Sequence, residues 1–181
     1  RLGKVQDVLM RITPGVEADT HEYIRTGCED SKFGFTMKND FAFNCVGDVL
    51  AAENVRLLGF HCHIGSQIFA LTSFREAVQV MTEFVLRVKE KYGFVTKELD
   101  MGGGLGIAYT ADDRPSSIDE FAECTVSAVR DFCAHYQLKE PRIMVEPGRS
   151  LVANAGVTLY TVGILKTLPG IRKYIAVDGG M

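Results

Sequence analysis

The sequence predicts an α/β fold with a parallel sheet of barrel-type βα units, followed by the start of a separate β domain. Three observations lead to this prediction. Short apolar runs that stop at glycine or proline alternate with stretches of helical periodicity, a pattern typical of parallel sheets with helices outside. Each unit takes roughly 35–50 residues, which suits barrel units with long loops. After Gly148 the pattern changes to strands with no helix between them.

Four apolar runs have the composition of buried strands, because they are rich in branched residues and end in turn-forming glycine or proline. They cover 7–15, 55–65, 97–104 and 141–148. Polar or glycine-rich motifs follow the last three runs. In a barrel the carboxyl ends of the strands meet on one face, where active sites lie. We therefore expect these motifs to lie close together.

Helices are expected between the runs, because apolar residues recur there at i, i+3 and i+4. The pattern is clear over 73–91 and 117–136 and weaker over 40–53. We interpret their apolar faces as core.

The start of each helix has a polar residue suited to capping. Ser73 with Glu76, and Ser117 with Glu120, have the spacing of a capping box, in which two N–H groups of the first turn gain acceptors. Asp40 is expected to open the helix over 40–53.

A domain boundary is predicted near residue 153. Residues 156–168 and 172–180 have strand composition and no helical stretch between them, which indicates a hairpin or a second antiparallel domain. We therefore assign 1–153 to the (β/α) domain and 154–181 to the first strands of a β domain.

The overall composition favours an ordinary globular protein. The chain has 181 residues, a net charge of −3 and 46% hydrophobic residues, which gives no basic face for nucleic acid. No apolar run approaches the roughly 20 residues of a membrane span. The five cysteines are odd in number and form no C-x-x-C pair, which indicates a reducing compartment.

Residues 61–68 read HCHIGSQI, with two histidines two positions apart. On a strand, His61 and His63 point to the same side. Three interpretations stay open: a zinc site, packed core histidines, or contact with a cofactor. A zinc site needs a third and a fourth ligand; Asp100, Glu146 and Asp178 could serve, but nothing in the sequence pairs them by spacing. We favour cofactor contact for His63 and predict no metal; the role of His61 is left undecided.

Three consecutive glycines, Gly102, Gly103 and Gly104, end the third run. They form neither a dinucleotide fingerprint nor a P-loop. One glycine would satisfy a tight turn, whereas three in a row expose successive N–H groups that suit a phosphate. Ser66, at the end of the neighbouring run, adds a hydroxyl donor. We expect Tyr109, further along the same loop, to be solvated.

Glu146 and Arg149 share a short turn at the end of the fourth run. They could form a local ion pair or remain solvated. Glu146, however, follows an apolar run that we expect to be buried, and a carboxylate leaving a buried strand needs a partner.

Several motifs in order resemble one family. HCHIGSQI, DMGGGLGIAY, VEPGRSLV and VDGGM follow one another, preceded by RITPGVEADTHEYIRTG and SKFGF. Together they resemble the diaminopimelate decarboxylases, which depend on pyridoxal 5′-phosphate (PLP) and have an alanine-racemase-like barrel. The resemblance covers essentially the whole chain. It implies a partial TIM (β/α)8 barrel, about the C-terminal half, plus the start of a β domain.

The resemblance also implies a role for each motif. His63 would stack on the face of the PLP ring, and Glu146 would bond the pyridine nitrogen. Arg149 would contact the substrate carboxylate or the cofactor phosphate. The remaining residues implied to hold the phosphate are Ser66, Gly102, Gly103 and Gly104.

The resemblance further implies what lies outside the chain. The lysine that binds PLP, the catalytic cysteine and the substrate-binding tyrosine are expected beyond its two ends, so we expect this piece alone to be inactive. The parent protein would decarboxylate meso-2,6-diaminopimelate to L-lysine as a cytoplasmic homodimer, with a plastid location not excluded. An ornithine or arginine decarboxylase of the same fold, and a non-catalytic homologue, remain alternatives.

Overall fold

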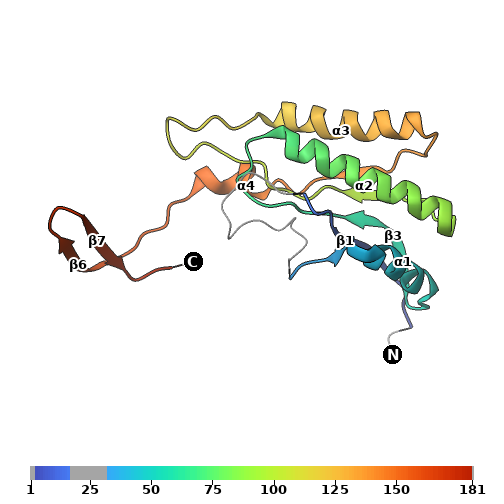
Figure 1. Ribbon diagram of the computed structural model, residues 1–181, viewed down its shortest axis with the longest axis horizontal. Coiled ribbons are helices and arrows are strands. Elements are labelled where there is room, and N and C mark those ends of the chain that lie inside the picture. The colour runs from blue at the N-terminus through green and yellow to red at the C-terminus, as the bar shows by residue number, and fades with distance from the viewer. Residues whose placement is uncertain (1–2, 17–31, 181) are drawn as a thin grey trace.

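The computed structural model describes residues 3–16 and 32–180, and Figure 1 shows their arrangement. Five parallel strands form one sheet in the order β2-β1-β3-β4-β5. Their bounds are β1 (Gln6–Thr13), β2 (Phe35–Thr36), β3 (Val55–His61), β4 (Glu98–Asp100) and β5 (Arg142–Met144). The predicted α/β fold with a parallel sheet is confirmed.

Helices connect successive strands of the sheet. They are α1 (Phe41–Ala51), α2 (Leu71–Tyr92) and α3 (Ile118–His135). All three lie within or close to the ranges predicted from periodicity. Strand β2 was not predicted; it contributes two residues and pairs with the end of β1. A run this short carries no period that a sequence pattern could detect.

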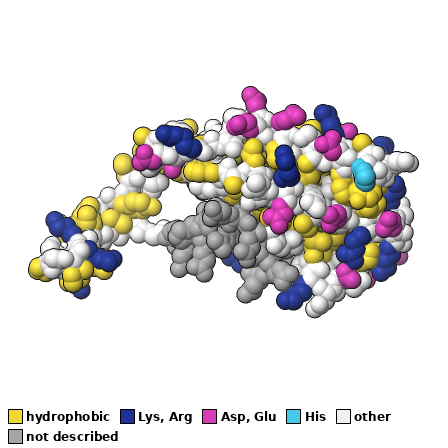
Figure 2. Space-filling model, turned by 45° about the horizontal axis from the view of Figure 1, so that its top comes forward, with side chains coloured by type: hydrophobic (Ala, Val, Ile, Leu, Met, Phe, Trp, Pro, Cys, Tyr) yellow, Lys and Arg dark blue, Asp and Glu magenta, His cyan; other side chains and the backbone are white. Residues whose placement is uncertain are grey.

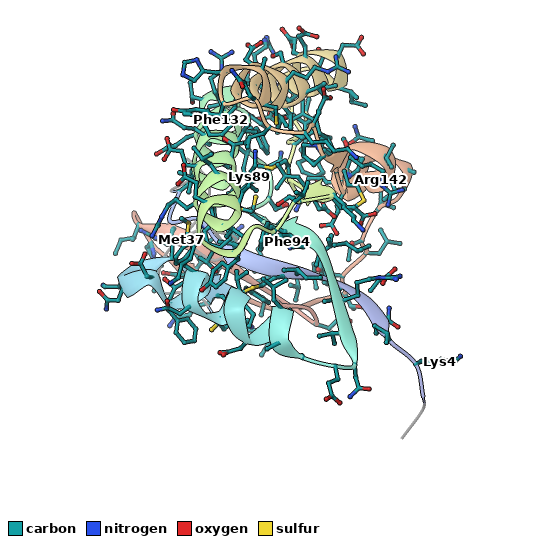
Figure 3. All side chains as sticks on the ribbon, turned by 90° about the vertical axis from the view of Figure 1, so that its right-hand side faces the viewer. Lys4, Met37, Lys89, Phe94, Phe132 and Arg142 are labelled. Atoms are coloured by element: carbon teal, nitrogen blue, oxygen red, sulfur yellow. The ribbon has the colours of Figure 1, made fainter. Side chains whose placement is uncertain are left out.

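Aromatic side chains join the helices to the sheet. Phe60 on β3 meets Phe84 on α2 edge to face, with ring centroids 5.1 Å apart, and both side chains are almost fully buried. Phe94, labelled in Figure 3, packs on the same Phe60 ring at 6.0 Å. Phe74 and Phe121 join α2 to α3 at 4.8 Å. Burying each such ring stabilises the fold by about 1.5–3 kcal/mol.

Only one predicted capping box is present. Ser117 and Glu120 form it at the start of α3. The box predicted at Ser73 is wrong, because α2 begins two residues earlier, at Leu71, and Ser73 is buried inside the helix. Asp40 precedes α1 as predicted but makes no side-chain cap. Its carboxylate instead accepts a hydrogen bond from Arg87 Nη2 at 2.8 Å.

The strands after Gly148 form an antiparallel hairpin of β6 (Val162–Leu168) and β7 (Arg172–Val177). The predicted strand start at 156 is wrong, since β6 begins at 162. A short helix, α4 (Gly148–Val152), and a 3₁₀ turn (Ala153–Ala155) precede the hairpin. Figure 1 shows the hairpin reaching away from the sheet. Hydrophobic side chains are exposed along it (Figure 2). The domain boundary near 153 remains a prediction.

Two further observations concern the residues that the structure describes. None of the helices within residues 3–16 and 32–180 has both the length and the apolar composition that a membrane span requires. The four cysteines within these residues are free: Cys45, Cys62, Cys124 and Cys133. Cys28, and the part of the motif over 11–27 that follows residue 16, lie outside the described residues.

Candidate cofactor site

The carboxyl ends of β3, β4 and β5 lie side by side because the strands pair in register. His61 is opposite Asp100, and Asp100 is opposite Met144. The pairing continues beyond the strands: Cys62 N donates to Asp100 O at 2.9 Å, and Glu146 N donates to Gly102 O at 2.7 Å. This extension brings the motifs that follow the three strands together.

Each of the three consecutive glycines lies against a neighbouring backbone. A Cβ on Gly102 would lie 2.4 Å from Cys62 O, and one on Gly103 would lie 2.1 Å from Glu146 O. A Cβ on Gly104 would lie 2.4 Å from Gly65 O. Close packing alone therefore requires all three glycines, and the argument that one would satisfy a turn is wrong.

Two of the three glycine N–H groups are used inside the protein. Gly102 N donates to Asp100 Oδ1 at 2.9 Å, and Gly103 N donates to His63 Nδ1 at 3.2 Å. Among the described residues, no acceptor is recorded for the Gly104 N–H. Three N–H groups were expected to be available to a phosphate. In the structure, only the Gly104 N–H has no recorded acceptor among the described residues.

His63 is held in its neutral form. Burial lowers its pKa below the usual histidine value, and the positive charge of Arg11 lowers it further, against the opposing effect of Glu146. Because Nδ1 accepts from Gly103, the ring proton lies on Nε2. A neutral, half-buried imidazole offers a flat face for stacking on an aromatic ring.

Glu146 lies in a more open position than predicted. The apolar run before it was expected to be buried, but β5 is an edge strand and Val145 is 42% exposed. The Glu146 side chain is 56% exposed, and its Oε2 lies 3.4 Å from His61 Nε2. The burial predicted for Glu146 is therefore not seen within the described residues, although a partner, His61, is present.

His61 is the residue that the sequence analysis left without a role. Ligand atoms of His61, Asp100 and Glu146 all lie within 4.8 Å of one another, so this trio, and not a pair of His61 with His63, is the arrangement that could hold a metal ion. The signal that could have revealed the trio is the strand register, which the sequence alone does not give.

Arg149 lies at the other end of the site, beside Ser66. Its Nε donates to Ser66 Oγ at 3.0 Å, and its Nη1 donates to the Tyr109 hydroxyl. Tyr109 was expected to be solvated; its ring is half exposed, but its hydroxyl is engaged. Asp113 fixes this loop by accepting from the N–H groups of Thr110 and Tyr109, which lowers the Asp113 pKa.

The donor set fits a ligand with an anion at one end and a protonated ring nitrogen at the other. Ser66, Arg149 and the Gly104 N–H provide hydrogen-bond donors and a positive charge at the anion end. Glu146 provides a carboxylate at the ring end. Gly103 contacts His63 and Glu146, so the glycine run joins the two ends. PLP has this distribution of groups.

A concave region lies away from the candidate site. A hollow of about 730 Å³ between α2 and α3 is lined in part by Leu71, Arg75 and Glu120. It contains none of the predicted site residues, and we assign it no role.

The fold and the site define a class of protein: an α/β domain that holds a small anionic cofactor at the carboxyl ends of its parallel strands. The family model described as "Pyridoxal-dependent decarboxylase, pyridoxal binding domain" matches residues 1–153. The chain belongs to this family, and its cofactor is PLP.

Individual relatives show which members of this family the chain resembles. The diaminopimelate decarboxylase of Bacillus subtilis (strain 168) is 51% identical over 175 residues, which are 97% of this chain and 40% of that protein. The Halalkalibacterium halodurans enzyme of the same name is 47% identical over the same shares. A crystal structure of diaminopimelate decarboxylase from M. jannaschii in co-complex with L-lysine aligns with a TM-score of 0.78 and 34% identity, covering 99% of this chain and 41% of that one. The chain thus spans about two fifths of these relatives.

Proposed function

We propose that the protein to which this chain belongs converts meso-2,6-diaminopimelate to L-lysine by PLP-dependent decarboxylation, in lysine biosynthesis. The carrying observation is the 51% identity to the Bacillus subtilis diaminopimelate decarboxylase over nearly the whole chain. The L-lysine in the M. jannaschii structure, the expected product, gives further support.

The phosphate end of the cofactor is assigned to Ser66, Arg149 and the Gly104 N–H. A hydroxyl, a guanidinium and a backbone N–H are charge-assisted donors to a phosphate. Gly102 and Gly103 contribute by allowing close backbone approach, because their own N–H groups have internal acceptors. Tyr109 steadies the Arg149 guanidinium through its hydroxyl.

The ring end is assigned to His63 and Glu146. His63 presents a neutral imidazole face, and Glu146 pairs its carboxylate with the protonated ring nitrogen, which favours the charged form of that nitrogen. When bound, PLP supplies an electron sink for the pair left at Cα as CO₂ departs. With PLP bound, Glu146 would hold the proton on the ring nitrogen, which would keep this electron sink effective.

The proposal places the intact protein in the cytoplasm as a homodimer. The free cysteines support a reducing compartment, and the dimer rests on resemblance to the family alone. The two alternative functions remain: a related decarboxylase acting on ornithine or arginine, and a non-catalytic homologue. The intact arrangement of His63, Ser66, Glu146 and Arg149 supports a catalytic parent.

The test is a comparison of substrates with the purified full-length protein and added PLP. CO₂ release and L-lysine formation should be much faster from meso-diaminopimelate than from ornithine, arginine or lysine. Preference for one of the other amino acids would refute the substrate assignment. Absence of turnover with all of them, in protein that binds PLP, would support the non-catalytic homologue.

A further inference from the structure

We propose that His61 is a positioning residue that holds the Glu146 carboxylate toward the cofactor's ring nitrogen. This inference rests on the proposed function. It starts from the contact between the two side chains, where His61 Nε2 lies 3.4 Å from Glu146 Oε2. That separation is slightly longer than an ordinary hydrogen bond, and a small rotation of the exposed Glu146 side chain closes it.

Glu146 needs such a partner because only its backbone is otherwise fixed. Its N–H donates to Gly102 O, and its carbonyl oxygen accepts from Gly148 N at 2.8 Å. Among the described residues, His61 is the only side chain recorded within hydrogen-bonding distance of the Glu146 carboxylate. Without it, no side chain recorded among the described residues restrains the Glu146 carboxylate.

His61 is suited to this role because its own position is rigid. It ends β3, between Arg11 on β1 and Asp100 on β4, and pairs in register with both. Its side chain is only 15% exposed. A largely buried side chain on a backbone fixed by two neighbouring strands can restrain a more exposed one at modest entropic cost.

The charges around His61 support the same role. Arg11 comes from β1, Asp100 from β4 and Glu146 from the segment after β5, while His63 follows on its own strand. Asp100 and Glu146 place carboxylate oxygens within 4.8 Å of each other, a distance at which like charges repel. A hydrogen bond donated by His61 Nε2–H to Glu146 Oε2 would offset part of this repulsion. Its removal should drive the exposed member, Glu146, away from the buried Asp100.

The test compares His61→Leu with His61→Gln in the full-length protein. The leucine removes the donor, whereas the glutamine amide retains one. His135→Gln on α3 is the matched control for loss of an imidazole. Two measurements do not depend on turnover: the PLP dissociation constant from absorbance titration, and the ¹⁵N chemical shift of PLP labelled at the ring nitrogen.

We expect His61→Leu to weaken PLP binding by about tenfold and to move the ¹⁵N signal toward that of a deprotonated ring. kcat should fall by about 10- to 100-fold, while KM changes by less than twofold. His61→Gln should recover most of each loss, and His135→Gln should behave as the wild type. A purely structural role would lower stability and leave the ¹⁵N signal unchanged, which would overturn the inference.

Two controls separate this inference from the proposed function. Failure of the wild-type protein to bind PLP would refute the function and the inference with it. If Glu146→Gln shifts the ¹⁵N signal and His61→Leu does not, only the inference fails. Stoichiometric Zn²⁺ or Mn²⁺ binding that is lost in His61→Leu would also overturn it, because the trio would then be a metal site.

Discussion

Replacing Gly103 by alanine should displace Glu146 from the site. A Cβ at this position would lie 2.1 Å from Glu146 O, whereas real Cβ atoms essentially never lie within 3.0 Å of such an atom. The two backbones must therefore separate by about 0.9 Å. They cannot do so freely, because Glu146 N donates to Gly102 O at 2.7 Å in the same place.

The size of the effect follows from these two contacts. Overpacking of this kind costs about 1–3 kcal/mol, and weakening one backbone hydrogen bond costs about 1 kcal/mol more. The free energy of unfolding should therefore fall by about 2–4 kcal/mol. PLP affinity should fall at least about tenfold, since a displacement near 1 Å can reduce the function of a preorganised site by about 10².

Urea denaturation of the full-length protein and absorbance titration with PLP measure the two effects. Gly148→Ala is a matched control in the adjacent helix α4. Its Cβ would meet nothing within 4 Å, and the N–H that donates to Glu146 O is kept. If Gly103→Ala unfolds and binds PLP like Gly148→Ala, the close approach of the glycine run to Glu146 does not determine the site.

Three further changes test other parts of the molecule. Ser117→Ala should lower the free energy of unfolding by about 1 kcal/mol in urea denaturation, because the Glu120 N–H loses its acceptor. Tyr109→Phe should weaken PLP binding two- to tenfold by titration, because Arg149 loses a partner, and should leave the urea midpoint nearly unchanged. The lowered pKa of His63 means that the unfolded state binds its proton more readily. The free energy of unfolding should therefore fall as the pH drops through the ordinary histidine value of about 6.5 and level off below the lowered pKa, and His63→Gln should reduce this dependence in urea denaturation between pH 8 and pH 5.

Each of these predictions has a control and an opposing result. Ser127→Ala also removes a helix hydroxyl but no cap, and an equal loss from both serines would contradict the capping argument. Tyr136→Phe is the control for Tyr109→Phe, because it removes a hydroxyl from an exposed ring that lies away from the site. Equal PLP affinities in the two variants would contradict the role of Tyr109. An unchanged pH dependence in His63→Gln would mean that His63 does not resist protonation.

The layout of the sheet and helices could be predicted because it follows from local patterns. Apolar runs ending in glycine or proline gave β1, β3, β4 and β5, and helical periodicity gave α1, α2 and α3. The capping box at Ser117 was correct, and the one at Ser73 was wrong, although their sequences fit the same pattern. The difference is that α2 gains its first turn from residues before Ser73, which the pattern does not weigh.

The proximity of the candidate site residues was predictable, and their contacts were not. Strand ends were enough to bring His63, the glycine run and Glu146 together. The exposure of Val145 was missed because burial of β5 depends on what covers a sheet edge, which local apolarity does not reveal. The contacts of His61 and Tyr109 were missed for a related reason. The partner of His61 is Glu146, 85 residues away, and the partner of Tyr109 is Arg149, 40 residues away. Strand register and the course of the loops bring these partners close, and local sequence patterns reveal neither.

The three consecutive glycines, Gly102, Gly103 and Gly104, differ in how their N–H groups are used. Gly102 and Gly103 donate inward, to Asp100 and His63, so they hold the strand ends together and orient the imidazole. Gly104, whose φ of 110° favours glycine, carries the N–H left without a recorded acceptor among the described residues. Under the proposed function, we expect phosphate binding to depend mainly on Gly104, Ser66 and Arg149. Substitutions at Gly102 or Gly103 should therefore act on PLP through His63 and Glu146, and a loss of phosphate affinity alone should arise only from changes at the other three positions.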